Sequence, residues 1–330
     1  MNNINAIKFL SEGASIISLA KEGEPSSVSL ECSYNGIDWS EWDLSALTLN
    51  SSGTLYIRGY NPDGFSSSFE AYYLFVIEGD KVSCSGNIMS LIDYKNLPDI
   101  IPCDYCFYGL FSRCTALTTA PELPAKRLAE SCYENMFEGC TSLKTTPELP
   151  AIELIDGCYY QMFANCASLI KAPALPATKL ANCCYSNMFS RCTALTTAPA
   201  LPATKLANCC YSNMFSRCTA LTTAPELPAQ TLADSCYTGM FLNCTALTTA
   251  PELPAQTLAD SCYAYMFKCC TSLKTAPELP AKTLVKSCYS GMFKGCTSLK
   301  TAPELPATRL AQWCYDYMIF SGCTALKDEQ

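Results

Sequence analysis

Cysteine is the residue type with the greatest chemical potential in this chain, which contains 24 cysteines and no histidine. The absence of histidine excludes a Ser-His-Asp or Cys-His nucleophile and any zinc site that needs imidazole. Pairs such as Cys236 and Cys244 are eight residues apart, and this is not a metal-ligand spacing. The pair Cys103-x-x-Cys106 is not accompanied by the second Cys-x-x-Cys pair that a zinc site of this type needs. The sequence therefore predicts no metal and no cofactor.

The recurring cysteines allow three interpretations: a ladder of buried thiols, disulfides between neighbouring repeats, or metal binding. Equivalent cysteines in adjacent coils would lie about 5 Å apart, which is inside the Cα window of a disulfide. Side chains in a parallel ladder point the same way, however, and this makes the torsion between the two sulfurs unfavourable. Free cysteine also packs as a small buried hydrophobe. We favour the thiol ladder.

Repeated glutamates are the second group that could do chemistry. Glu226, Glu252 and Glu278 recur at one fixed interval along the chain. Acid and base roles in glycoside hydrolysis need two carboxyl groups in distinct environments, whereas glutamates related by a repeat have nearly equivalent environments. The chain also lacks a glycine-rich phosphate loop, a nucleophile elbow and a metal motif. We expect that the protein is not an enzyme.

A sequence unit that recurs with a fixed period positions these side chains. Nine units begin between Cys106 and Cys314, and the unit that starts at Cys236 reads CYTGMFLNCTALTTAPELPAQTLADS before the next one begins at Cys262. Self-similarity at this period is typical of a solenoid, in which each coil buries its apolar face against its neighbours. The sequence therefore predicts a solenoid of nine stacked coils.

Each coil is expected to contain a short helix, a short strand and a turn bounded by proline. Leu232, Cys236 and Met240 are spaced by four, which predicts an apolar helical stripe. Residues 220–224 are the predicted strand, because the prolines that follow can neither continue a helix nor donate to a ladder. These elements define an α+β repeat.

The chain is predicted to have two domains, at residues 1–85 and 86–330. In the first, runs of β-forming residues such as 72–77 alternate with clusters of Gly, Ser, Asn and Pro. Asn35-Gly36 is a turn dipeptide suited to a hairpin. We therefore expect a small all-β sandwich before the solenoid.

Two columns of threonine and one column of glutamate are the candidate ligand-binding positions. They contain Thr196, Thr222 and Thr248; Thr197, Thr223, Thr249 and Thr275; and Glu226, Glu252 and Glu278. Adjacent threonines of a strand point to different faces, and this disfavours a flat ice-binding array. The glutamates form either a solvated rim, which we favour, or a rim that binds a cation or a cationic ligand.

Aromatic residues outside the repeat pattern are further candidates. Tyr160 and Tyr265 occupy positions that are small or polar in most other coils, so they are either ligand contacts or partly exposed packing residues. Trp39, Trp42 and Tyr60 in the first domain are either core aromatics, which we favour, or a platform that stacks on a sugar.

The repeat motifs Cys-Tyr-x-x-Met-Phe-x-x-Cys-Thr-x-Leu and Leu-Pro-Ala-x-x-Leu resemble the BspA-type leucine-rich repeats of bacterial surface proteins, in the variant found in gut bacteria. The resemblance covers about residues 100–330. It implies a leucine-rich-repeat solenoid, a non-enzymatic adhesion or recognition function, and a location at the cell surface or outside the cell. It also implies that the preceding segment is the β-rich domain that often accompanies these repeats.

The distribution of charge and of apolar residues argues against two classes of binding partner, nucleic acids and lipid bilayers. Residues 1–99 carry 13 acidic and 5 basic side chains, whereas residues 100–330 carry 17 of each. Because no basic stripe and no apolar run of membrane-spanning length is present, we expect neither nucleic-acid binding nor bilayer insertion. No signal peptide is visible in the first residues.

The expected function is adhesion or recognition, in which the solenoid face binds a host protein, a glycan or another cell surface. Two alternatives remain open. One is a virion- or phage-associated structural or receptor-binding protein on the same scaffold, and the other is an intracellular interaction scaffold.

Overall fold

The computed structural model of the protein describes residues 4–317 and 319–326. Its strands and helix are, in chain order, β1 (Ile7–Ser11), β2 (Ser15–Glu22), β3 (Leu30–Ser33), β4 (Ser40–Glu41), β5 (Leu47–Leu49), β6 (Thr54–Gly59), β7 (Ser66–Ser68), β8 (Ala71–Gly79), β9 (Val82–Ser85), α1 (Ser90–Asp93) and β10 (Leu117–Thr119). The chain forms two compact units. Of the described residues, the first unit holds those before Ile152 together with Met162–Leu169, and the second holds Ile152–Gln161 and those after Leu169.

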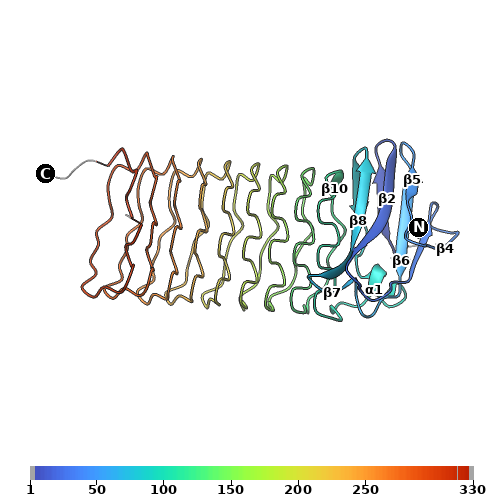
Figure 1. The fold of residues 1–330 in the computed structure, drawn as a ribbon, viewed down its shortest axis with the longest axis horizontal. Coiled ribbons are helices and arrows are strands. Elements are labelled where there is room, and N and C mark those ends of the chain that lie inside the picture. Colours follow the sequence, from blue (N-terminus) through green and yellow to red (C-terminus); the bar gives the residue numbers. More distant parts are fainter. Residues whose placement is uncertain (1–3, 318, 327–330) are drawn as a thin grey trace. The chain divides into compact units, whose positions relative to one another are not determined.

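The strands of the first unit form two sheets, with the orders β10-β9-β1-β6-β3-β4 and β5-β2-β8-β7. Figure 1 shows β5, β2 and β8 side by side, and the long β2–β8 pairing runs from Ser15 to Glu22. Side chains alternate between buried and partly exposed along β6, as expected for strands with one face in a core. Phe9 of β1 meets Phe75 of β8 with ring centroids 5.4 Å apart, so the apolar faces of the two sheets pack on each other.

The first coil of the repeat packs directly against these sheets. Strand β10 of that coil pairs in parallel with β9. The ring of Phe111 stacks on Phe75 with centroids 4.9 Å apart, and the thiol of Cys114 donates to the Phe75 carbonyl oxygen at 3.1 Å. Residues on both sides of position 85 therefore lie in the same compact unit, and the division into domains 1–85 and 86–330 stays a prediction.

The helix predicted in each coil is wrong. Its segment is instead a ribbon of consecutive four-residue turns, which we call the turn ribbon. The backbone N–H of Ser186 donates to the carbonyl oxygen of Cys183 in the same coil at 3.0 Å. The next N–H, that of Asn187, donates to the carbonyl oxygen of Ser212 in the following coil at 2.8 Å. Every fourth residue has a positive φ, including 53° at Cys183 and 56° at Asn187. A spacing of four residues is common to a helix and to this ribbon, so the apolar stripe could not distinguish them.

The strand predicted over 220–224 is reduced to one bridging residue per coil. Thr223 pairs in parallel with Thr197 on one side and with Thr249 on the other. Proline begins the next segment and has no N–H to extend the ladder. The predicted strand is therefore a column of isolated parallel bridges in the second unit, whose coils follow one another in chain order (Figure 1, yellow to red).

The coils of the second unit are held together by columns of identical buried side chains. Tyr211 and Tyr237 stack with centroids 5.8 Å apart and an interplanar angle of 4°, and Phe215 and Phe241 stack at the same distance. Met240 is fully buried. Burying a side chain of this size contributes about 1.5–3 kcal/mol, so repetition of the columns accumulates the stability that one coil cannot provide.

The recurring cysteines are buried thiols, as predicted, and all 24 cysteines are free. The second cysteine of a coil also has a polar role. The thiol of Cys218 donates to the Phe189 carbonyl oxygen at 3.0 Å, and that of Cys244 donates to Phe215 at 3.0 Å. Burial raises the pKa of Cys244 to about 12. The thiols therefore keep the hydrogen that they donate.

Candidate binding face

The segment that follows the bridging threonine carries the outward-facing side chains of each coil. From Pro225 to Gln230 burial alternates strictly: Pro225, Leu227 and Ala229 face inward, while Glu226, Pro228 and Gln230 are exposed. This is the pattern of an extended backbone with a period of two. We call the exposed side chains of residues 222–231 and of the equivalent segments in neighbouring coils the arm face.

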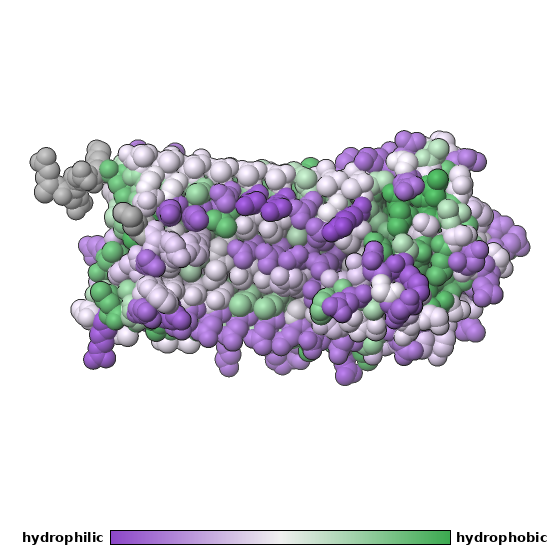
Figure 2. Space-filling view, in the orientation of Figure 1, coloured by the Kyte–Doolittle hydropathy of each residue, from purple (hydrophilic) through white to green (hydrophobic). Residues whose placement is uncertain are grey.

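Consecutive segments enclose shallow hollows on the arm face. One hollow of about 420 Å³ is lined by Glu226 and Glu252 with the prolines around them. The next, of about 400 Å³, is lined by Glu252, Thr275 and Glu278, again with prolines. The structure thus brings all three predicted glutamates and Thr275 to one series of hollows. On the face seen in Figure 2, hydrophilic side chains fall in rows along the repeat coils.

The threonine columns lie beside these hollows in sequence and are accessible. Thr196, Thr197, Thr222, Thr223, Thr249 and Thr275 are exposed, and Thr248 is half-buried. Thr222 and Thr223 are both exposed, and the expectation that adjacent threonines point to different faces stays a prediction. The isolated bridging residue Thr223 does not impose the alternation of a continuous strand. The N–H of Thr222 still donates to Thr196 at 3.4 Å.

Sequence reasoning missed several residues of the arm face. A further hollow is lined by Lys205, Pro228, Gln230 and Thr231 among others. Pro228 was interpreted only as a breaker of secondary structure. The signal that identifies it is the alternation of apolar and polar residues in Pro-Glu-Leu-Pro-Ala-Gln, which has the period of an extended segment.

The glutamates of the hollows present one carboxylate per coil to solvent. Within the described part of the repeats, the ion pairs involve other carboxylates: Glu138 pairs with Arg113 in the first unit and Glu153 with Lys179 in the second. Carboxylates at successive coils repel one another unless they are solvated or meet positive charge. Glu226, Glu252 and Glu278 are therefore positions that favour cationic groups or hydrogen-bond donors, on an arm face that also carries exposed lysines such as Lys205 and Lys274.

Tyr160 and Tyr265 belong to the turn ribbon, a different segment of the coil from the arm face. The hydroxyl of Tyr160 accepts a hydrogen bond from the Gln161 side chain at 3.0 Å. Tyr265 has a φ of 56° and lies 5.7 Å from the exposed ring of Tyr317, measured between centroids. Both tyrosines are half-buried. The structure therefore does not bring the predicted tyrosines together with the predicted threonines and glutamates.

The aromatic residues of the first domain do not form a continuous sugar platform. Trp42 is buried, stacks on Phe75, and donates from its indole nitrogen to the Ser45 carbonyl oxygen at 2.9 Å. Trp42 is therefore a core aromatic, as the favoured interpretation predicted, and not part of a sugar platform.

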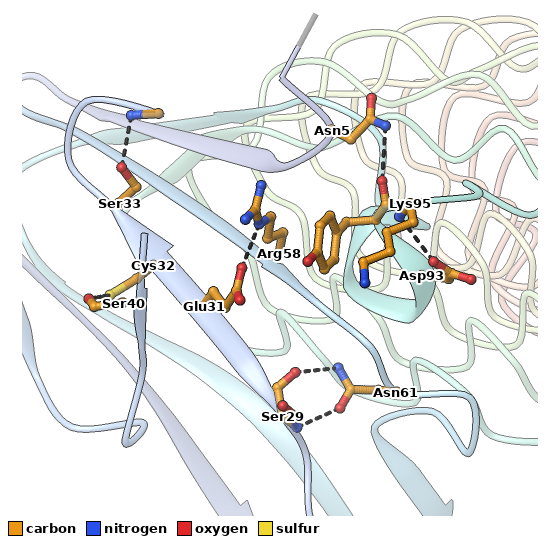
Figure 3. Close-up of polar contacts among 12 residues, drawn as sticks. Asn5, Ser29, Glu31, Cys32, Ser33, Ser40, Arg58, Asn61, Asp93 and Lys95 are labelled. Atoms are coloured by element: carbon orange, nitrogen blue, oxygen red, sulfur yellow. Dashed lines mark hydrogen bonds and ion pairs between the residues drawn. The ribbon is translucent and has the colours of Figure 1, made fainter. Parts of the chain in front are cut away.

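Trp39 and Tyr94 instead enclose a cation. The Arg58 guanidinium lies 3.7 Å from the Trp39 ring centroid and 4.2 Å from that of Tyr94. Arg58 also pairs with Glu31 at 2.7 Å, as Figure 3 shows. One face of Trp39 is therefore occupied, whereas Tyr60 is 61% exposed.

No cluster of three or more His, Cys, Asp or Glu side chains arranged to hold a metal ion is found in 4–317 and 319–326. Over the same residues, no helix has the length and apolar character needed to cross a bilayer.

A scan against protein families matches this chain to the BspA type leucine rich repeat region, in six copies over residues 103–248 and 208–327. The match counts six copies where the spacing of the sequence predicts nine coils, so that number stays a prediction. Comparisons with the curated proteins and with the solved structures found no match. The matched residues form more than half of the chain and contain the turn ribbons and the arm face, and the chain therefore belongs to the BspA-type leucine-rich repeat family.

Proposed function

We propose that this protein is a non-enzymatic adhesion and recognition protein, which binds a protein or glycan ligand through its arm face. Leucine-rich repeat proteins of this family are typically non-enzymatic binding scaffolds and are often surface-associated. Solenoids commonly bind through the extended surface that their repeats generate. The adhesion role and the choice of face are what this proposal adds to the family assignment.

The observation that supports the arm face is the recurrence of one chemical group in three consecutive coils. Glu226, Glu252 and Glu278 line successive hollows and are all exposed. A ligand with repeated positive charges or donors would engage several coils at once, and linked weak contacts give an affinity above that of any one of them. A compact ligand that reaches only one coil would gain no such increase in affinity.

The test is a binding screen of the purified chain against immobilised host glycans and extracellular-matrix proteins. The triple variant Glu226→Gln, Glu252→Gln and Glu278→Gln should weaken the strongest interaction at least about tenfold at low salt, because it removes three exposed carboxylates from consecutive hollows. The matched control carries Glu24→Gln, Glu41→Gln and Glu70→Gln. It removes the same charge from exposed positions of the first unit.

Retained binding in the hollow variant, or an equal loss in the control, would overturn the arm face as the contact. A salt titration of the parent gives an independent measure, since contacts between exposed charges weaken as ionic strength rises.

Location tests the adhesion role itself. An antibody against the repeats would be applied to intact cells with and without external protease, to purified particles and to cytosol. We expect a protease-sensitive signal on intact cells. A signal confined to particles would support the virion-associated alternative, and one confined to cytosol would replace adhesion with an intracellular scaffold.

A further inference from the structure

Cys103 is the cysteine whose surroundings differ most from those of the repeat ladder. In later coils the position three residues before the first repeat cysteine is apolar, as at Ala207 and Ala233. Cys103 occupies this position before Cys106, so two thiols lie three residues apart at the start of the first turn ribbon. Cys103 is half-buried, whereas Cys106 is fully buried.

The backbone holds the two cysteines close together. In the equivalent turns the N–H of the repeat cysteine donates to the residue three positions earlier, as Cys236 does to Ala233 at 3.3 Å. The ends of such a turn lie within about 7 Å of each other, which overlaps the Cα separation of about 4.4–6.8 Å required by a disulfide. Tyr105, inside the Cys103–Cys106 turn, has the positive φ of 54° typical of the ribbon.

Gly64 supplies an independent measure of this proximity. A Cβ placed on Gly64 would lie 2.7 Å from the Cys103 sulfur and 3.0 Å from the Cys106 Cα. The Cys103 sulfur and the Cys106 Cα are therefore less than about 6 Å apart. This separation is compatible with a disulfide between the two cysteines. The neighbouring N–H of Phe65 donates to the Cys106 carbonyl oxygen at 2.8 Å and fixes this cysteine in place.

The turn is also anchored from the second coil. The N–H of Tyr105 donates to the Glu130 carbonyl oxygen at 2.8 Å, and the N–H of Glu130 donates to the Asp104 carboxylate at 3.0 Å. Both residues between the two cysteines are thereby held. The dithiol is thus a preorganised geometry and not a chance approach of two flexible side chains.

We propose that Cys103 and Cys106 form a redox-active dithiol, which exchanges with small-molecule disulfides and closes reversibly to an intramolecular disulfide. This inference concerns a site in the first unit and is independent of the arm face. The two thiols have distinct tasks, because only Cys103 is accessible. Cys103 is the attacking thiol and Cys106 is the resolving thiol.

Hydrogen bonding supports this division of tasks. A hydrogen bond from the Cys106 thiol holds the pKa of Cys103 below its ordinary value, while burial and that same bond raise the pKa of Cys106. The thiolate is the reactive form of cysteine. The buried thiols of the repeat ladder have raised pKa values, as at Cys132 and Cys210, both about 12, and are therefore expected to be inert.

The exchange proceeds in two steps. The Cys103 thiolate attacks one sulfur of the small disulfide, the S–S bond breaks, and one thiolate leaves with a mixed disulfide formed at Cys103. That released thiolate takes the proton of Cys106, whose sulfur attacks Cys103 and expels the second thiolate. Two electrons pass from the protein dithiol to the small disulfide, which is reduced to two thiols, while the protein gains one S–S bond.

The test uses the full chain, reduced, desalted and incubated with glutathione disulfide. Remaining thiols are then alkylated under denaturing conditions and the digest is mapped by mass spectrometry. We expect a peptide that contains Cys103 and Cys106, lacks two hydrogens and carries no alkyl group, while Cys236 and Cys244 are alkylated. Dithiothreitol should restore both alkylation sites.

Two variants separate the tasks of the two thiols. Cys106→Ala should trap the mixed disulfide with glutathione at Cys103, whereas Cys103→Ala should abolish both the mixed and the intramolecular disulfide. The matched control is Cys269→Ala, at another half-buried cysteine, and it should leave the Cys103–Cys106 product unchanged. Complete alkylation of Cys103 and Cys106 in the treated parent protein, or a disulfide mapped to another pair, would overturn the proposal without relying on any variant.

Discussion

The thiol of Cys244 donates a hydrogen bond to the carbonyl oxygen of Phe215 in the preceding coil, over 3.0 Å. That oxygen also accepts the backbone N–H of Cys218 at 3.0 Å. The same arrangement recurs at Cys218, Cys270 and Cys296. Cysteine is thus used at this position as a small apolar side chain that still carries one donor.

Replacing Cys244 by alanine should therefore remove a buried hydrogen bond and leave a small void. We expect a loss of about 1–3 kcal/mol in the free energy of unfolding, measured by urea titration. Cys209→Ala is the control, because Cys209 is half-buried and outside the ladder column. A loss no greater than that of the control would show that the thiol hydrogen bond does not stabilise the stack.

The turn ribbon and a helix predict opposite effects for one substitution. Gly291 has a φ of 56°, and a Cβ there would lie 2.7 Å from the ring of Tyr265. Gly291→Ala should destabilise the protein by about 1–3 kcal/mol in the ribbon, whereas in a helix it would stabilise by about 0.5–1 kcal/mol. The measurement is the urea midpoint.

Two companion variants separate backbone strain from the clash. Adding Tyr265→Ala to Gly291→Ala should recover part of the loss by relieving the contact. Gly139→Ala should show the cost of positive φ with little clash, because its nearest atom is a side-chain carbon of Arg113 at 3.4 Å. A gain in stability for Gly291→Ala would contradict the turn ribbon.

Stability should fall as pH rises above about 9. Burial raises the pKa of Cys244 and of Cys262 from 9.0 to about 12, so the folded protein retains protons that the unfolded chain releases in this range. The stabilising contribution is complete below pH 9 and is lost progressively towards pH 12. Each such thiol adds a slope of up to about −1.4 kcal/mol per pH unit.

Urea midpoints between pH 7.5 and about pH 10.5 measure this dependence. The double variant Cys244→Ala and Cys262→Ala should have a shallower slope than the parent. Buried tyrosines such as Tyr237 have pKa values raised by burial and add to the effect at the upper end of the range. A constant midpoint over the whole range would show that the thiols are not buried as described.

Exposed threonines should tolerate charge. Thr223→Lys, Thr249→Lys and Thr275→Lys together should change the free energy of unfolding by less than about 0.5 kcal/mol per site, because all three side chains are exposed. The same variant should weaken binding of a cationic ligand to the arm face. A large loss of stability would mean that these side chains are packed, and unaltered binding would move the contact elsewhere.

Much of the architecture could be predicted from the residues alone. The fixed period of the repeat specifies stacked coils, because an apolar face that recurs at a constant interval can be buried only against its own copies. The apolar character of Met240 and its column specifies the core side of each coil. The occurrence of Cys at both repeated positions without His or a ligand spacing correctly indicated buried thiols.

The backbone conformation of each coil depends on contacts with the neighbouring coils, which the sequence of one coil does not contain. In the turn ribbon alternate N–H groups donate to the next coil, as Asn187 does to Ser212, so stacking stabilises positive φ values that an isolated segment would avoid. A period of four residues is the same in a helix and in this ribbon. The choice between them is made by hydrogen-bond partners in the following coil.

Contacts between segments far apart in the sequence also explain three further features of the structure. Thr222 and Thr223 are both exposed in a segment that has an isolated bridging residue and not a continuous strand. Trp42 lies in the core, as the favoured interpretation predicted, and Phe75 from a different sheet covers it. Cys103 and Cys106 are close because a turn and the Gly64 backbone hold them. Local patterns predicted which residues would be buried, and hydrogen bonds between distant segments determined the backbone that buries them.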